Sequence, residues 1–166
     1  MNDRSSRALS SSAQRVQAAL RAAGLDCVVS EHATPARTSA EAAATLGCSI
    51  GEIAKSLVFR GDDGTALLVV ASGANRVDLA KLESLARTWI HKADAEFVRA
   101  VTGYAIGGVP PLGHARPLQV YVDRDLMRYE LVHAAGGTPN AMFPIRPPDL
   151  VRASGGIVAD IALLAQ

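Results

Sequence analysis

Residues 56–71 read SLVFRGDDGTALLVVA, and this stretch predicts the centre of the fold. Its two apolar runs, Ser56–Arg60 and Ala66–Ala71, are rich in the branched and aromatic residues that favour β-strands. Gly61-Asp-Asp-Gly64 separates the two runs and is typical of the tight turn of a β-hairpin. We therefore expect an antiparallel pair of strands in the middle of the chain.

Helical spacing and capping patterns organise the residues before this hairpin. Apolar residues recur at helical spacing from Ser12, and Gly24 is a suitable C-terminal stop. Thr38-Ser-Ala-Glu41 has the pattern of a capping box, in which the threonine hydroxyl accepts an amide hydrogen bond at a helix start. The expected order is a disordered tail (1–11), a helix from Ser12, a strand at Leu25–Ser30, a loop at 32–37, a helix from Thr38 to Leu46, and one further turn between Ser49 and Glu52.

Short helices and short strands alternate after the hairpin. They are expected at Asp78–Ala86 (helix), Thr88–His91 (strand), Asp94–Thr102 (helix), Leu118–Val122 (strand), Asp123–Met127 (turn), Glu130–Ala134 and Ala141–Ile145 (strands), and Pro147–Arg152 (helix), with Ile157–Ile161 ending the chain. No repeat or linker interrupts this order. We expect one α+β domain over residues 12–166, with a mixed, mainly antiparallel sheet surrounded by helices.

Composition and charge limit the class of function. The chain has 166 residues, of which 49% are apolar and 20% are charged, which suits one globular domain. Its formal net charge of +1 argues against a DNA-binding protein with a wholly basic surface, so contact with RNA would need a small site. No stretch approaches 18 continuous apolar residues, so we expect no membrane partner and a cytoplasmic location.

Familiar catalytic and metal-binding motifs are missing from the sequence. It contains no GxSxG, HExxH or P-loop motif, and its four histidines have no common metal spacing. Cys27 and Cys48 are expected to be reduced thiols rather than a disulfide. We therefore expect neither a bound metal nor a cofactor.

Lys55 is the first residue that could carry chemistry. It lies among apolar neighbours in Ile53-Ala-Lys-Ser-Leu-Val-Phe59, where a partly buried ammonium needs carbonyl or anionic partners. Three interpretations stay open from this pattern alone. Lys55 either extends its charge to solvent from a strand end, grips a phosphate or carbonyl oxygen, or forms a Schiff base as in a pyridoxal enzyme.

The second candidate is the segment Gly103-Tyr-Ala-Ile-Gly-Gly-Val-Pro-Pro-Leu-Gly113, which we call the glycine-rich segment. Its glycines permit positive φ and close approach of a ligand to backbone N–H groups, and its prolines stiffen the chain. Such a segment can form an oxyanion hole from backbone atoms, but a wide surface turn has the same composition.

Several motifs, taken in chain order, resemble one known family. They are Thr38–Gly47, Ile53–Phe59, Thr102–Gly113, Val122-Asp123, Gly136-Gly137, Pro148–Leu150 and Val158–Ile161. Together they make residues 25–165 similar to the YbaK/EbsC/ProX family, also called the INS editing domain. The lysine strand followed by GYxxGGxxPxG is the specific part of this resemblance.

The resemblance implies a function and a set of site residues. Members of the family hydrolyse mischarged aminoacyl-tRNA, commonly tRNA for proline, without metal or cofactor. Lys55 matches the family's essential lysine, the amide of Gly107 is implied to polarise the ester carbonyl, and Ser56 is implied to meet the substrate. The other predicted substrate contacts are Thr38, Gly103, Gly108, Ala135, Gly136, Gly137 and Thr138.

Some positions depart from the branch of the family that acts on cysteinyl-tRNA. That branch has aromatic residues where this chain has Ser30 and Thr38, and a serine where this chain has Ala135. We therefore expect a small aliphatic or hydroxylated amino acid. The expected partners are the acceptor end of aminoacyl-tRNA and a synthetase that delivers it. The alternative is a non-catalytic module of the same fold that binds an aminoacyl group, tRNA or a synthetase.

Overall fold

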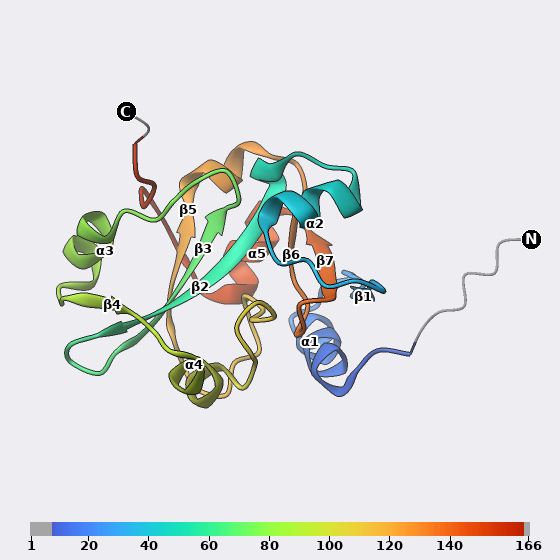
Figure 1. Ribbon diagram of the computed structural model, residues 1–166, viewed down its shortest axis with the longest axis horizontal. Helices are drawn as coiled ribbons and strands as arrows, with labels where there is room; N and C mark the ends of the chain where they lie inside the picture. The colour runs from blue at the N-terminus through green and yellow to red at the C-terminus, as the bar shows by residue number, and fades with distance from the viewer. Residues whose placement is uncertain (1–7, 165–166) are drawn as a thin grey trace, which may run out of the picture.

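A mixed β-sheet organises residues 8–164, the part of the chain that the computed structural model describes (Figure 1). Its strands are β1 (Ser30–Glu31), β2 (Ile53–Gly61), β3 (Ala66–Ser72), β4 (Ile90–Lys92), β5 (Gln119–Asp123), β6 (Val132–Ala135), β7 (Ala141–Ile145) and β8 (Ile157–Ala159). The order across the sheet is β1-β7-β6-β2-β3-β5-β8, and β4 also pairs with β2. Pairs β1–β7, β6–β7, β2–β3 and β2–β4 are antiparallel, whereas β2–β6, β3–β5 and β5–β8 are parallel. The predicted mixed, mainly antiparallel sheet is confirmed.

The central hairpin forms as the sequence predicts. β2 and β3 pair from Ala54↔Ser72 to Arg60↔Ala66, and the turn closes with a hydrogen bond from the N–H of Gly61 to the carbonyl of Thr65 at 2.8 Å. β2 is longer than expected because it begins at Ile53, where it pairs with β6.

Side-chain caps mark four of the helix starts in this part of the chain. They are α1 (Ser11–Ala22), α2 (Ser39–Leu46), α3 (Leu79–Ala86), α4 (Ala95–Thr102) and α5 (Pro147–Ser154), with 3-10 turns η1 (Ile50–Glu52) and η2 (Arg124–Arg128). The side chains of Ser10, Thr38, Asp78 and Asp94 accept amide hydrogen bonds at helix starts. No helix in residues 8–164 is both long and apolar enough to span a membrane.

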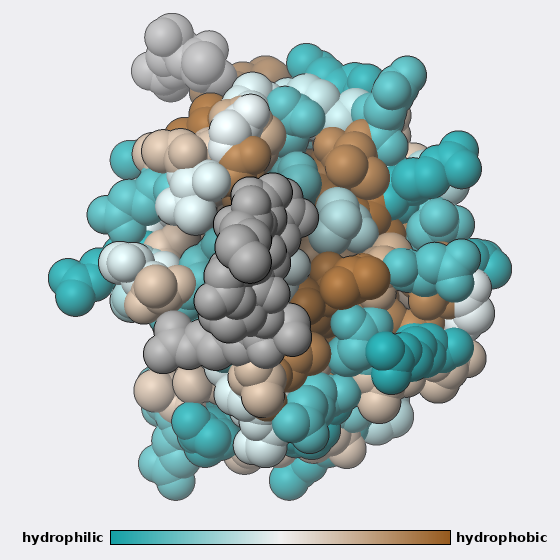
Figure 2. Space-filling view, turned by 90° about the vertical axis from the view of Figure 1, so that its right-hand side faces the viewer, coloured by the Kyte–Doolittle hydropathy of each residue, from teal (hydrophilic) through white to brown (hydrophobic). Residues whose placement is uncertain are grey.

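The two faces of the sheet carry different helices. Alternate residues of a strand point to opposite faces, so Val58 and Leu68 join one core that includes α1, α4 and α5. Phe59 and Leu67 point the other way, into a smaller core with α3. On the side of the molecule that carries α1 and β1, apolar atoms appear between hydrophilic ones (Figure 2).

One edge of β2 has a gap in its pairing. Along this edge, β6 pairs with Ile53 and Ala54, and β4 pairs only from Phe59 onwards. Residues 55–57 therefore have no strand partner on that side, although Ala93 N–H reaches the carbonyl of Val58 at 3.4 Å. The glycine-rich segment, which follows α4, lies below β2 in Figure 1. A gap beside a central strand leaves backbone and side chains accessible to a ligand.

The predicted strand at Leu25–Ser30 is wrong for most of its length. Only Ser30 and Glu31 pair, with β7, whereas the preceding residues are irregular. Gln17 of α1 explains the difference, because its side chain accepts a hydrogen bond from Val29 N–H at 2.9 Å and donates one to the carbonyl of Cys27 at 2.8 Å. A side chain thus replaces the sheet partner that this backbone would otherwise need.

The start of the domain also differs slightly from the prediction. Ser10 caps α1, which begins at Ser11, so these residues do not belong to a tail. Residues 8 and 9 of the predicted tail precede this cap, and residues 1–7 lie outside the described residues.

Candidate active site

Two adjacent cavities lie at the gap in the sheet, and each has a volume of about 370 Å³. Both are lined by residues 55–57 of β2 and by Ile106, Gly107 and Val109 of the glycine-rich segment. The structure therefore brings Lys55 and Gly107 to the boundary of the same two spaces, although they are distant in sequence.

The ammonium of Lys55 is held in one direction by the backbone. Its Nζ donates a hydrogen bond to the carbonyl of Asn75 at 2.6 Å, in the turn between β3 and α3. A lysine ammonium has three N–H donors, and the described residues accept from one of them, which leaves two for a ligand. Lys55 is only partly exposed, which limits competition from water for those donors.

A partly buried polar network fixes the turn that holds Lys55. The side-chain amide of Asn75 donates to Oδ2 of Asp123 at 2.9 Å and to Oδ2 of Asp125 at 2.8 Å. Asp123 is fully buried, and it also accepts hydrogen bonds from the backbone N–H groups of Ser72 and Asp125. The carboxylate of Asp123 therefore positions Asn75, and Asn75 in turn positions Lys55.

The surroundings of Lys55 disfavour its charged form. Burial lowers the pKa of Lys55, the Arg76 guanidinium lowers it further, and Asp123 opposes both. Within residues 8–164 Lys55 forms no ion pair, so an anionic or carbonyl oxygen in the cavities would meet an unpaired ammonium and would favour its charged form.

Gly107 occupies a turn that leaves its amide free. The N–H of Gly108 donates to the carbonyl of Ala105 at 3.0 Å, and the φ of Gly107 is +89°. A positive φ at the third position of a turn is typical of a type II turn, which favours glycine. Within residues 8–164 the Gly107 N–H has no hydrogen-bond acceptor, and Gly107 lines both cavities.

Gly108 serves close packing between two turns. The N–H of Gly137 donates to the carbonyl of Gly108 at 3.0 Å. A Cβ atom added to Gly108 would lie 2.6 Å from Cα of Thr138, a distance that real Cβ atoms do not reach. This contact fixes the glycine-rich segment against the turn between β6 and β7.

Ser56 lines both cavities. Its Oγ is buried and has no hydrogen-bond partner among the described residues. A buried hydroxyl without a partner is costly, and the Ser56 side chain would have to change its rotamer before a ligand in a cavity could bond to it.

The other predicted substrate contacts divide into two groups. Thr38, the N-cap of α2, and Ala135, the last residue of β6, line the second cavity. The remaining five do not line either cavity, and their direct contact with substrate stays a prediction: Gly103, Gly108, Gly136, Gly137 and Thr138. The structure gives some of them packing roles, since Gly103 ends α4 in the left-handed conformation and Gly136 and Gly137 are buried.

The two cavities are lined by only a few kinds of chemically active side chain. Within the described part of the chain, no His, Asp, Glu or Cys lines either cavity, and no group of three such residues could hold a metal ion. The charged residues that do line them are all basic: Arg37, Lys55, Arg76 and Lys92. Such walls suit an anionic ligand, and they offer backbone N–H and ammonium donors rather than a side-chain base.

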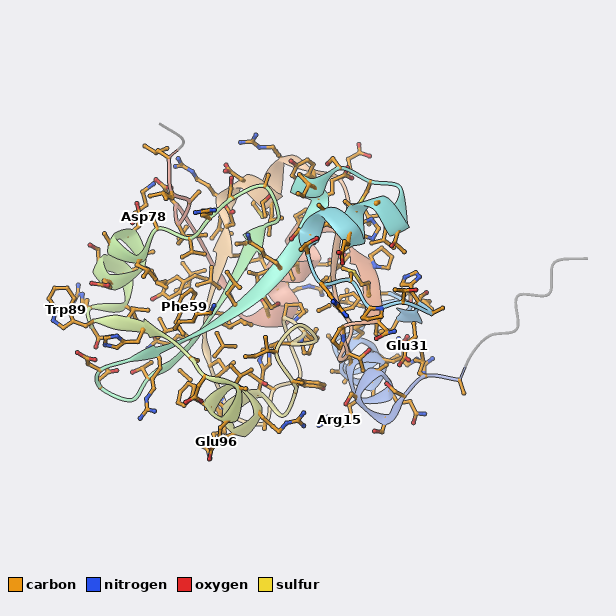
Figure 3. The ribbon with its side chains drawn as sticks, in the orientation of Figure 1. Arg15, Glu31, Phe59, Asp78, Trp89 and Glu96 are labelled. Atoms are coloured by element: carbon orange, nitrogen blue, oxygen red, sulfur yellow. The ribbon has the colours of Figure 1, made fainter. Side chains whose placement is uncertain are left out.

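Arg15 connects α1 to the glycine-rich segment (Figure 3). Its guanidinium donates to the carbonyl of Gly103 at 3.0 Å and lies 4.6 Å from the centre of the Tyr104 ring. The contact joins the first helix to the segment that carries Gly107.

Sequence reasoning missed Asn75, Arg76, Asp123 and Arg15 as residues of the site. A signal existed for Asp123, since an acidic residue directly follows an apolar run and must find partners if it is buried. No local pattern distinguishes Arg15 from other exposed helix residues, because its partners lie after α4.

No thiol or histidine lines either cavity in the described part of the chain. Cys27 and Cys48 are free, and burial raises the pKa of each. His91 is paired with Asp62, and His114 contacts the carbonyl of Pro110 at 2.6 Å.

The chain is similar to a known protein family and to several known proteins. A family model described as "Aminoacyl-tRNA editing domain" matches residues 33–153. The uncharacterized Bacillus subtilis protein YwhH is 36% identical over 122 residues, which make up 74% of this chain and 78% of that protein. The Enterococcus faecalis protein EbsC, named as a candidate Cys-tRNA(Pro)/Cys-tRNA(Cys) deacylase, is 28% identical over 128 residues, or 74% of this chain and 76% of that protein. A crystal structure described as a candidate trans-editing enzyme for prolyl tRNA synthetase superposes with a TM-score of 0.90 at 47% identity, covering 94% of this chain and 99% of that one.

Proposed function

The chain belongs to the aminoacyl-tRNA editing domain family, and we propose that it hydrolyses the ester bond of mischarged aminoacyl-tRNA, with tRNA of the proline type as substrate. The observation that carries this proposal is that Lys55 and Gly107 line the same two cavities. A cation and a free backbone N–H at one boundary match the needs of an ester whose carbonyl oxygen becomes negative during attack.

The reaction we propose uses placement of groups rather than a side-chain base. A water oxygen attacks the ester carbonyl carbon, and the electron pair of the C=O bond moves to the carbonyl oxygen. The Gly107 N–H and the Lys55 ammonium stabilise that oxyanion. When it collapses, the C–O bond to the ribose breaks, and the proton that water loses ends on the departing ribose oxygen.

The absence of His, Asp, Glu and Cys side chains from the described cavity walls is compatible with this reaction. An aminoacyl ester is already activated, so an oriented water and a stabilised oxyanion can supply much of the acceleration. A neighbouring ribose hydroxyl of the tRNA would orient the water, which is the assistance that the family resemblance implies.

We further propose that the amino acid is small. The second cavity has short side chains in its wall, among them Ala36, Thr38, Ala42, Ser56 and Ala135. A prolyl-tRNA synthetase that forms the wrong product would supply the substrate, in keeping with the name of the structural relative. These events belong to the cytoplasm, where tRNA is charged. The non-catalytic alternative is not favoured, because the family match is an editing domain and two relatives are named as a candidate deacylase and a candidate trans-editing enzyme.

A deacylation screen tests the function. Purified protein is mixed with tRNA for proline charged in turn with alanine, serine, threonine, cysteine and proline, and the remaining ester is measured over time. We expect rapid loss of at least one small non-cognate amino acid and no loss of proline. Absence of turnover on every mischarged tRNA would reject the function.

Lys55→Ala is the accompanying variant, and we expect it to remove most of the activity. Arg99→Ala is its matched control, because Arg99 is an exposed cation of α4 that lines neither cavity. Equal rates for Lys55→Ala and the unchanged protein would contradict the role given to Lys55.

A further inference from the structure

The two cavities that meet at Lys55 and Gly107 differ in charge and polarity. We call the first the cationic cavity, because its wall includes Lys55, Arg76 and Lys92. We call the second the hydroxyl cavity, because its wall includes Thr38, Ser39 and Ser56, although Arg37 and Lys55 also reach it. A ligand that spans both cavities should therefore bind in one preferred orientation, which the difference between their walls determines.

The cations of the cationic cavity are not neutralised by ion pairs among the described residues. Lys55, Arg76 and Lys92 come from three separate segments, namely β2, the turn before α3, and β4. Within residues 8–164 none of them forms an ion pair, and no carboxylate lines the cavity. This gathering is notable in a chain whose formal net charge is only +1. The cavity is suited to a phosphate.

The rest of the cationic cavity is apolar. Val58, Phe59, Val77, Leu79 and Val98 complete much of its wall. Phe59 lies on β2 between α3 and α4 in Figure 3. A flat, weakly polar ring could pack against these side chains while a phosphate attached to it meets the cations at the mouth. A nucleotide has both parts.

Resting on the proposed function, we infer that the cationic cavity binds the terminal nucleotide of the tRNA and the hydroxyl cavity binds the amino acid. The ester joins these two parts of the substrate, so it falls at the shared boundary formed by Lys55 and Gly107. In the reverse orientation the phosphate would meet two cations, Arg37 and Lys55, instead of three. The positively charged α-amino group would then meet three cations instead of two.

Adenosine 5′-monophosphate, which mimics the terminal nucleotide, is the probe for this inference. Its binding is followed by amide NMR shifts of the full chain at millimolar concentrations. We expect saturable shifts around Ala93 and Val98, which line only the cationic cavity, and little change at Thr38 and Ser39. Shifts centred on Thr38 and Ser39, or no shifts at all, would overturn the inference.

Charge-removal variants sharpen the test. The double variant Arg76→Ala/Lys92→Ala should weaken adenosine monophosphate binding at least about tenfold, since each charged contact typically contributes that much or more. Both side chains are exposed, so folding should be retained, and the amide spectrum checks this. Leu79→Glu, which adds a carboxylate to the same wall, should have a similar effect. Arg99→Ala is the control and should bind normally; equal binding by the double variant and this control would overturn the inference.

Competition distinguishes the tRNA end from a free nucleotide as the natural ligand. Adenosine monophosphate should inhibit deacylation competitively against mischarged tRNA, and the double variant should raise KM more than it lowers kcat. Binding without competition would overturn the assignment to tRNA. Failure of the proposed function has a different signature, namely no deacylation by the unchanged protein whatever its nucleotide binding.

Discussion

The Nζ atom of Lys55 donates a 2.6 Å hydrogen bond to the backbone carbonyl of Asn75, in the turn that follows β3. Lys55 and Ala71 are paired across the hairpin, so the turn begins close to the strand position from which the lysine extends. The side chain of Asn75 is in turn held by Asp123 and Asp125. The ammonium is therefore fixed by a chain of contacts that ends in the buried carboxylate of Asp123.

Asn75→Ala should lower kcat about tenfold and leave KM nearly unchanged. The variant keeps the carbonyl that accepts from Lys55, but the turn loses its two side-chain hydrogen bonds, so the ammonium is less well placed. The free energy of unfolding should fall by about 1–2 kcal/mol. Single-turnover kinetics and denaturant unfolding measure the two effects. A variant that loses stability but keeps its full kcat would show that Asn75 is structural only.

Activity and stability should depend on pH in opposite ways near the pKa of Lys55. Burial, with help from Arg76, lowers this pKa below its usual 10.5 in the folded protein. If the charged form is needed, activity falls as pH rises through the lowered pKa. Between the folded and unfolded pKa values the unfolded chain binds more protons, so stability rises with pH in that window.

Lys55→Met is the control for both pH measurements. Its residual rate is subtracted to remove spontaneous ester hydrolysis, and its unfolding free energy should lack the rise that Lys55 causes. An identical stability profile in the variant and the unchanged protein would contradict the pKa shift. A rate that does not fall at high pH would contradict the need for the charged ammonium.

Gly107→Ala should lose mainly activity, whereas Gly108→Ala should lose mainly stability. An alanine at position 107 must adopt a φ near +89°, which costs about 1–2 kcal/mol, but its Cβ meets only Pro139 at an ordinary 3.6 Å. Its kcat should fall about a hundredfold, because the amide proposed to meet the oxyanion is displaced. An alanine at position 108 would collide with the backbone of Thr138 and should cost about 3 kcal/mol of stability.

Thermal unfolding and kcat, measured on both glycine variants, separate these effects. We expect Gly107→Ala to lose proportionally more activity and Gly108→Ala to lose more stability. Normal kcat in a folded Gly107→Ala protein would remove Gly107 from the mechanism.

Arg15→Ala should lower kcat severalfold while reducing stability by only about 1 kcal/mol. Buried residues Ala13, Val16 and Leu20 still anchor α1, but the glycine-rich segment loses its contacts at Gly103 and Tyr104. A double-mutant cycle with Gly107→Ala tests whether Arg15 acts by positioning the glycine-rich segment. If it does, the effects of the two substitutions on log kcat should not add.

Arg21→Ala is the matched control for Arg15, since Arg21 is an exposed arginine of the same helix. It should leave kcat unchanged. Simple additivity of Arg15→Ala and Gly107→Ala would show that Arg15 does not act through the glycine-rich segment.

Local patterns in the sequence predicted most of the elements of the fold. The hairpin at β2 and β3 follows from two apolar runs around Gly61–Gly64, and α2 follows from the capping pattern at Thr38. Each signal depends on residues that are close in the chain, so no knowledge of the rest of the protein is needed. The strand expected at Leu25–Ser30 fails because Gln17, in a preceding helix, takes the place of a sheet partner.

The sequence by itself thus determined the fold class, the central hairpin, and the lysine and glycines whose order resembles an editing domain. Only the tertiary structure decided that residues 55–57 face a gap between β6 and β4, and that Lys55 and Gly107 border the same cavities. It also decided that Asn75 and Asp123 hold the lysine in place. Helices and turns arise from interactions between near neighbours, whereas the site is formed by strands and turns that meet only when the sheet closes its long-range pairings.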